Sequence, residues 1–137
     1  MIEFNYETNF KLEDESVIRN WVTNCITDYD RTEKELSFIF CDDAYLHKLN
    51  VEFLKHDTLT DIISFDYSVG KAISGDIFIS VERVRENAKK FSQTFDNEIN
   101  RVIIHGILHL CGFGDKSPEE EVEMRAEENA CLDKLNT

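Results

Sequence analysis

Proline and glycine are scarce in this sequence, with one proline and five glycines among 137 residues. No Pro-, Gly- or Ser-rich linker and no internal repeat interrupts the chain. Hydrophobic residues make up 42% and charged residues 31%, a composition typical of globular proteins. We therefore expect a single domain over residues 1–137, long enough to bury a substantial core.

Long apolar runs are also absent. No stretch approaches the roughly 20 apolar residues that span a membrane, and the start, MIEFNYETNF, lacks the basic and apolar regions of a signal peptide. No two cysteines have the CxxC spacing of a zinc knuckle or a thioredoxin-like site. We expect a cytoplasmic protein without membrane contact, whose cysteines are reduced thiols. These are Cys25, Cys41, Cys111 and Cys131.

Basic residues are few, with 15 Lys and Arg against 28 Asp and Glu and a net charge of −13. This balance argues against broad, charge-driven binding of nucleic acid, which normally needs a basic face. It leaves room for a small local patch. The densest basic region comprises Arg83, Arg85, Lys89, Lys90 and Arg101. We interpret this region as an exposed helix face, and as the place where RNA would bind if it binds anywhere.

The apolar residues follow strand and helix periodicities in turn. Alternating or short apolar patterns predict strands near residues 2–6, 36–40, 61–67 and 75–80. Spacings of three and four, with N-capping residues, predict helices near residues 17–29, 46–53, 81–91, 97–111 and from 117 onward. Asp42 or Asp43 and Ser80 are expected caps, and Ser117 with Glu120 forms a capping box. In the third helix, Phe91 is expected on the apolar side.

The predicted element order is β-α-β-α-β-β-α-α-α. Strand–helix–strand connections favour parallel neighbours, whereas the short loop containing Gly70 favours an antiparallel pair. We therefore expect the α+β class with an α/β-like arrangement. It would contain a mixed four-stranded sheet, mostly parallel with one antiparallel strand, covered by about five helices.

His105 and His109 carry the main chemical signal. Residues four apart on a helix lie on the same face, so both imidazoles can bind one metal ion. The surrounding segment is apolar almost all round, which predicts a buried helix. Two histidines there need polar partners or a metal. An isolated HxxxH pair can also arise by chance, with both rings as hydrogen-bonded core residues.

Asp115 is the expected third ligand. Gly112 is a natural helix C-cap and Gly114 adds a second flexible point, so the chain can turn Asp115 back toward the rings. Cys111 is a rival ligand by chemistry but points to a different helix face. Two histidines and a carboxylate leave an open position on one zinc ion for water. The expected catalytic group is this metal-bound water, and no protein base is assigned.

The segment His105-Gly-Ile-Leu-His109-Leu-Cys-Gly112-Phe113 resembles the signature of the bacterial YbeY endoribonucleases. The resemblance covers roughly residues 36 to 130. The other matching segments, in order, are Leu49-Asn50, Thr60-Asp61-Ile-Ile-Ser64-Phe65, Gly75-Asp76-Ile-Phe-Ile-Ser80, and Glu120 with Met124 and Glu128. Gly106 stands where the HExxH metalloproteases have their catalytic glutamate, so peptide hydrolysis by that mechanism is not expected.

The chain departs from the family pattern at three positions. Asp115 stands in place of a third histidine, which changes metal affinity and metal choice. Gly114 stands in place of an aspartate. The family also carries an arginine implicated in activity where this chain has Leu54, and Lys55 beside it is the available cation.

The resemblance implies a metal-dependent endoribonuclease specific for single strands. It implies a role in rRNA maturation at the 3′ end of the small-subunit (16S) rRNA and in ribosome quality control, with a possible ribosomal protein or assembly factor as partner. Two alternatives remain open, another small metallohydrolase and a non-catalytic ribosome assembly factor with a structural metal. Further substrate or metal-supporting candidates are Lys55, Asp61, Ser64, Asp76 and Glu128. For Asp61, Ser64 and Asp76 the alternative is strand capping and turn hydrogen bonds, and for Glu128 a solvated helix position.

Overall fold

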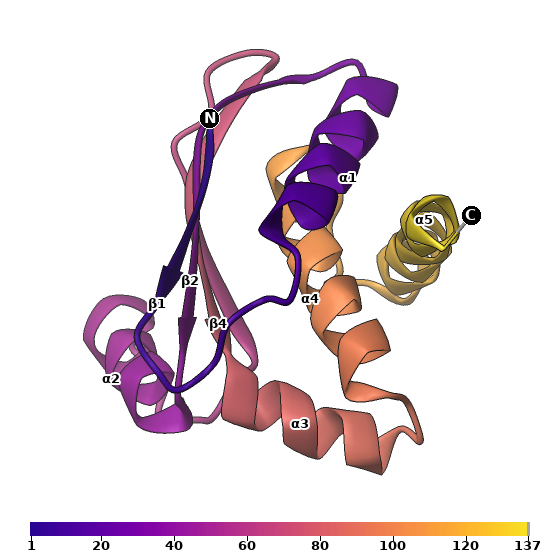
Figure 1. Ribbon diagram of the computed structural model, residues 1–137. Coiled ribbons are helices and arrows are strands. Elements are labelled where there is room, and N and C mark those ends of the chain that lie inside the picture. The colour runs from indigo at the N-terminus through magenta and orange to yellow at the C-terminus, as the bar shows by residue number, and fades with distance from the viewer. Residues whose placement is uncertain (137) are drawn as a thin grey trace.

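A mixed four-stranded sheet forms the centre of the computed structural model, which describes residues 1–136 (Figure 1). Its strands are β1 (Ile2–Tyr6), β2 (Thr32–Cys41), β3 (Ile62–Asp66) and β4 (Ala72–Ser80), in the spatial order β1-β2-β4-β3. The pairs β1/β2 and β2/β4 are parallel, and β3/β4 is antiparallel. The predicted mixed sheet with one antiparallel strand is confirmed.

Five helices accompany the sheet, in the predicted order along the chain. They are α1 (Glu15–Asp28), α2 (Asp43–Leu54), α3 (Val81–Lys90), α4 (Phe95–Leu110) and α5 (Pro118–Leu135). Each begins with a side chain that accepts a hydrogen bond from a backbone N–H of the first turn. The expected caps Asp42 and Ser80 act in this way, and Ser117 forms a complete capping box with Glu120. The α+β class is therefore confirmed.

The helices lie in layers around α4. In Figure 1, α1 and α4 lie on one side of the sheet, α2 lies on the other, and α5 packs outside α4. Most of α4 is buried, including Ile103, Ile104, Ile107 and Leu108, which have no exposed surface. A helix covered by the sheet, α1 and α5 must be apolar nearly all round, as the sequence predicts. Polar groups on such a helix must find partners inside the protein.

Phe91 differs from its expected position on the apolar side of α3. That helix ends at Lys90, and Phe91 is its C-cap with 54% of its surface exposed. Ser92 then adopts a φ of 55°, in the left-handed region, and the chain turns out of the helix. The ring therefore projects beyond the face on which Val84 and Ala88 are buried.

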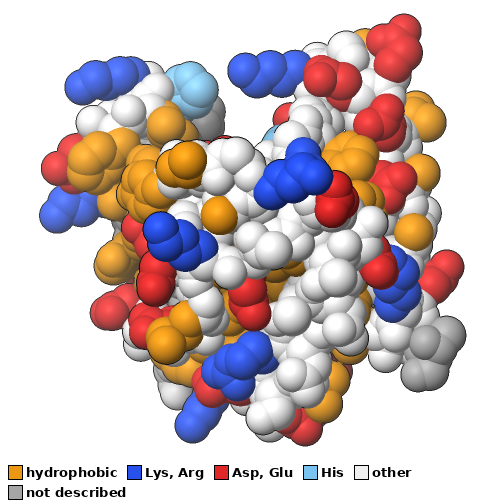
Figure 2. All heavy atoms as spheres, turned by 90° about the horizontal axis from the view of Figure 1, so that it is seen from above, with side chains coloured by type: hydrophobic (Ala, Val, Ile, Leu, Met, Phe, Trp, Pro, Cys, Tyr) orange, Lys and Arg blue, Asp and Glu red, His pale blue; other side chains and the backbone are white. Residues whose placement is uncertain are grey.

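The basic residues near α3 do not form one surface. Arg83 donates to Asp43 at 2.7 Å, and Arg101 donates to Glu128 at 2.9 Å. On the opposite face, which Figure 2 shows from above, the Lys and Arg side chains also lie apart, with acidic side chains between them. The expectation of an exposed helix face is therefore wrong for Arg101, which is largely buried by its acidic partner.

All four cysteines are buried and free. Within residues 1–136, every helix is too short or too polar to cross a membrane.

Gly75 allows the close approach of β3 and α4 to β4. A Cβ atom at this position would lie 2.6 Å from the Phe65 carbonyl oxygen and 3.2 Å from Leu110 Cδ1. The first contact is with backbone of the paired strand, which cannot move without loss of the β3/β4 pairing. A glycine here is therefore a steric requirement of the fold.

We expect Gly75→Ala to lower the free energy of unfolding by about 1–3 kcal/mol, the usual cost of overpacking. Urea-induced unfolding followed by circular dichroism measures this change. Val69→Ala is the matched control on the same hairpin, because Val69 is 80% exposed and its replacement should change stability by less than about 0.5 kcal/mol. Equal stabilities of the two variants would contradict the steric argument.

Candidate metal centre

Three side chains converge at the C-terminal end of α4. His105 Nε2 and His109 Nε2 lie 3.0 Å apart, and Asp115 Oδ2 lies 3.3 Å from the first and 3.2 Å from the second. All three residues are partly buried. Among residues 1–136 they are the group of His, Cys, Asp or Glu side chains that could hold a metal ion. Cys111 is not part of it.

The chain reversal after α4 brings Asp115 to the histidines. Gly112 has a φ of 104°, which suits glycine, and its N–H and that of Phe113 donate to carbonyl oxygens of the last helical turn. Gly114 lies against the Glu120 carboxylate, which a side chain at this position would displace. Glu120 in turn accepts hydrogen bonds from the backbone N–H groups of residues 116 and 117. The capping box of α5 thus holds the segment beside Asp115.

The second nitrogen of each histidine has a hydrogen-bond acceptor of its own. His105 Nδ1 lies 2.6 Å from Glu128 Oε2, and His109 Nδ1 lies 2.9 Å from the Phe113 carbonyl oxygen. Because a carbonyl or a carboxylate accepts, both Nδ1 atoms carry the proton. When both rings are neutral, each presents an Nε2 lone pair toward the other and toward Asp115. Three converging acceptors repel one another unless a cation lies between them, and the donor set therefore fits a metal ion.

Glu128, which accepts from His105, is buried, with 5% of its surface exposed. Burial raises its pKa, but hydrogen bonds from His105 and Arg101 outweigh burial, so the net pKa lies below its ordinary value. Burial likewise lowers the pKa of His105, but the bond to Glu128 and its charge outweigh it, and the net pKa is raised. The carboxylate also lies 3.7 Å from Arg125 Nη1. Glu128 is thus held ionised and fixes the His105 ring.

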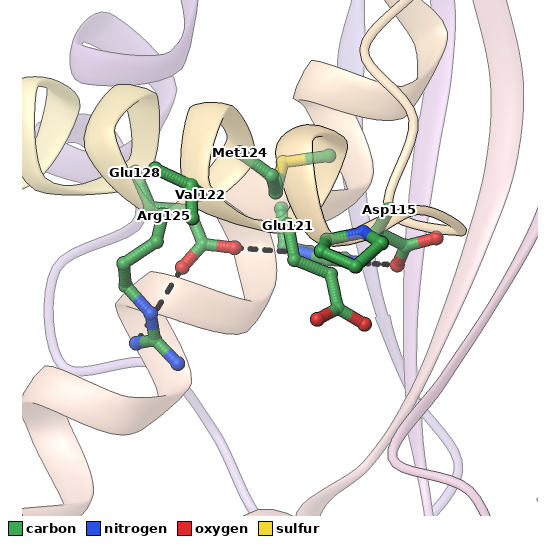
Figure 3. A pocket seen from close by; sticks show the side chains of 8 residues that line it. Asp115, Glu121, Val122, Met124, Arg125 and Glu128 are labelled. Carbon is green, nitrogen blue, oxygen red and sulfur yellow. Dashed lines mark hydrogen bonds and ion pairs between the residues drawn. The ribbon is translucent and has the colours of Figure 1, made fainter.

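Two cavities adjoin the three side chains, and both are lined by His105 and Asp115. The larger, of about 610 Å³, lies against α5. Figure 3 shows Glu121, Met124, Arg125 and Glu128 on that helix, with Asp115 beside them. The smaller, of about 290 Å³, extends toward the end of α3. The centre is therefore open to molecules on two sides.

The other predicted site residues are dispersed. Asp61 lines the smaller cavity, and burial raises its pKa. Ser64 lies within β3 opposite Ile77, and Asp76 lines a separate cavity of about 330 Å³. Lys55 is the C-cap of α2 with a φ of 60°. Of these candidates, Asp61 and Glu128 adjoin the histidines, whereas Lys55, Ser64 and Asp76 are not among the described residues that line either cavity.

Sequence reasoning missed two charged residues at the centre. Glu98 is buried in α4 and lines the smaller cavity, and Arg125 lines both cavities. A glutamate in a helix predicted to be buried was a usable signal for Glu98. Arg125 lies on the mostly exposed, acidic α5 and carried no comparable signal.

Comparisons with known proteins identify the family of this chain. Residues 2–136 match the family model described as Endoribonuclease YbeY. An Endoribonuclease YbeY of Flavobacterium johnsoniae is 57% identical over 94% of this chain and 93% of its own length. That of Bacteroides thetaiotaomicron is 46% identical over 82% of each chain. The solution structure of TM1509 from Thermotoga maritima has the same fold, with a TM-score of 0.67 and 23% identity over 99% of this chain and 92% of that one. The chain therefore belongs to the YbeY family, whose model and curated relatives are named endoribonucleases.

Proposed function

We propose that this protein is a zinc-dependent endoribonuclease that cleaves single-stranded RNA. The observation that carries the proposal is the convergence of three lone-pair donors, His105, His109 and Asp115, beside two open cavities. The name of the family supports the reaction type. The geometry supports the metal, since both Nδ1 atoms face acceptors while both Nε2 atoms converge with the Asp115 carboxylate.

Zinc fits this donor set better than a hard cation. Imidazole is a favourable ligand for zinc, whereas magnesium and calcium prefer oxygen alone. Donors about 2.0–2.1 Å from a tetrahedral zinc ion lie about 3.3–3.4 Å from each other. The observed separations of 3.0, 3.2 and 3.3 Å between His105, His109 and Asp115 are close to this. When bound, zinc supplies a Lewis acid that activates water and offsets the charge of a phosphodiester.

The protein's own residues orient the metal ligands and would bind the substrate. Glu128 holds His105 in one tautomer and ring orientation, and the Phe113 carbonyl does the same for His109. The guanidinium of Arg125, whose side chain is 63% exposed, lies at the border of both cavities, where it can bind a phosphate. No protein base is assigned to the reaction.

In the cell, we infer that the substrate is rRNA of the small ribosomal subunit and that the enzyme acts in the cytoplasm. Maturation of the 3′ end of 16S rRNA and ribosome quality control are the proposed roles. A net charge of −13 disfavours strong binding of RNA by charge alone. A ribosomal protein or assembly factor as partner would supply the missing affinity.

A structural metal in a non-catalytic assembly factor is less well supported. Structural zinc sites usually have four protein ligands and are closed to solvent. Within residues 1–136 the candidate group has three, and cavities adjoin it on two sides. An open coordination position is the arrangement that catalysis requires.

Zinc-loaded protein should cleave labelled single-stranded RNA and leave double-stranded RNA intact, and a chelator should abolish the cleavage. We expect His109→Ala to lower the cleavage rate by more than about 100-fold. It removes a ligand, whereas loss of a supporting partner alone costs about 10–100-fold. His47→Ala is the matched control, because His47 on α2 pairs with Asp57 and should leave the rate unchanged. Equal trace cleavage by wild type and His109→Ala would indicate a contaminating nuclease and refute the proposal.

Glu128→Gln should weaken zinc binding about 10–100-fold, because the amide is a poorer acceptor for the His105 Nδ1–H than the carboxylate. Competition with a chromophoric chelator measures the affinity. Glu123→Gln removes a carboxylate from an exposed position on the same helix and should have no effect. If both variants bind zinc as the wild type does, Glu128 does not orient a ligand.

A further inference from the structure

The smaller cavity holds groups that the metal centre does not use. It shares His105 and Asp115 with that centre and adds Asp61, Phe91 and Glu98. These three come from the start of β3, the end of α3 and the first turn of α4. The cavity thus has an aromatic residue and two further carboxylates directly beside the proposed reaction site.

Phe91 presents an aromatic surface at this cavity. It is 54% exposed although the neighbouring apolar residues of α3 are buried. Lys90 Nζ lies 5.7 Å from the centre of its ring, which leaves part of the ring surface uncovered. An exposed aromatic ring beside a cationic side chain is the usual arrangement for stacking an unpaired base of RNA.

Glu98 is a buried carboxylate without a hydrogen-bond partner. It is 6% exposed and lines the cavity, and no other described residue, from 1 to 136, donates a hydrogen bond to its side chain. Burial raises its pKa. Burial also raises the pKa of Asp61, which lines the same cavity. The Glu98 oxygens are not among the buried side-chain atoms without a partner within residues 1–136, so they reach the cavity. Because a carboxylate only accepts hydrogen bonds, this part of the cavity favours a ligand that brings N–H donors.

We propose that this cavity binds one unpaired nucleobase with an exocyclic amino group, stacked on Phe91 and donating N–H bonds to Glu98 and Asp61. The proposal rests on the proposed function and deepens it. Arg101 also lines this cavity, but it already donates to Glu128 and Asn129. The two carboxylates therefore disfavour a phosphate there, whereas a base is neutral. Arg125, at the border with the larger cavity, would contact the adjacent phosphate.

This subsite would explain selection of single strands. A paired base has its amino group in a Watson–Crick bond and its faces stacked within the helix, so it cannot enter. The cavity volume of about 290 Å³ lies at the lower end of the usual range for small-ligand pockets, which suits one base and not a duplex.

Phe91→Trp replaces the proposed stacking ring with a fluorescent indole. The one native tryptophan, Trp21, is 4% exposed and donates to the Cys131 carbonyl oxygen, so it reports little from solution. We expect single-stranded oligo(A) to quench the added indole emission of this variant saturably, with oligo(U) binding more weakly, and neither to quench the wild type. No quenching of the variant at saturating RNA would overturn the stacking role.

Phe91→Ala should raise the KM for single-stranded RNA about tenfold with kcat unchanged, because stacking is lost equally in the ground and transition states. Tyr67→Ala is the matched control, since Tyr67 is 58% exposed and lines the separate cavity beside Asp76. Equal KM values for the two variants would count against the proposal.

Glu98→Gln tests base selection with little change of shape, and thermal unfolding checks that the variant folds. An amide can donate to uracil as well as accept, so the preference for oligo(A) over oligo(U) should fall about tenfold. If the ratio of the affinities for oligo(A) and oligo(U) is unchanged, Glu98 does not select the base. The quenching experiments with Phe91→Trp do not require cleavage. Quenching with no RNA cleavage would refute the nuclease proposal alone, and cleavage with no quenching would refute the base subsite alone.

Discussion

The hydrogen bond between His105 and Glu128 joins the two helices on which the candidate site depends. Helix α4 runs through the interior, and its polar side chains must be satisfied there. Glu98, Arg101, His105 and His109 follow one another at spacings of three, four and four, and so form one polar stripe on an otherwise apolar helix. Helix α5 lies against α4 and contributes the partner of two of these residues.

Different sides of helix α4 thus serve the stability of the fold and the chemistry of the site. The apolar sides of α4 pack against the sheet and α1, so the helix is rigid, and its polar stripe is positioned by packing rather than by loops. The C-terminal turn is equally constrained, because Gly112 reverses the chain and the capping box of α5 holds the segment that follows Asp115. Asp115 completes the group of three donors and adds a negative charge that the two histidines lack.

The acidic character of the chain shapes how it can recognise RNA. With a net charge of −13, general attraction to phosphates is weak, and the predicted basic region is divided among local ion pairs. Recognition would then depend on few, specific contacts near the metal centre. The Phe91 ring, the carboxylates of Glu98 and Asp61, and the exposed guanidinium of Arg125 are contacts of that kind. They are least accessible to a base already paired in a duplex.

Local features of the sequence determined the order and nature of the elements and the placing of His105 and His109 on one helix face. Periodicity, caps and an i, i+4 spacing act within a few residues, so they can be read without knowledge of the fold. Tertiary structure decided which distant groups meet them. Glu128 and Asp61 reach the site through the packing of α5 and β3 on α4, and Phe91 is exposed because α3 ends one residue early. Asp76 lies elsewhere because strand register, set by non-local pairing, places it opposite Phe65, on the face of the sheet away from α4. Ser64 is opposite Ile77 on the face turned toward α4, but it lines neither cavity.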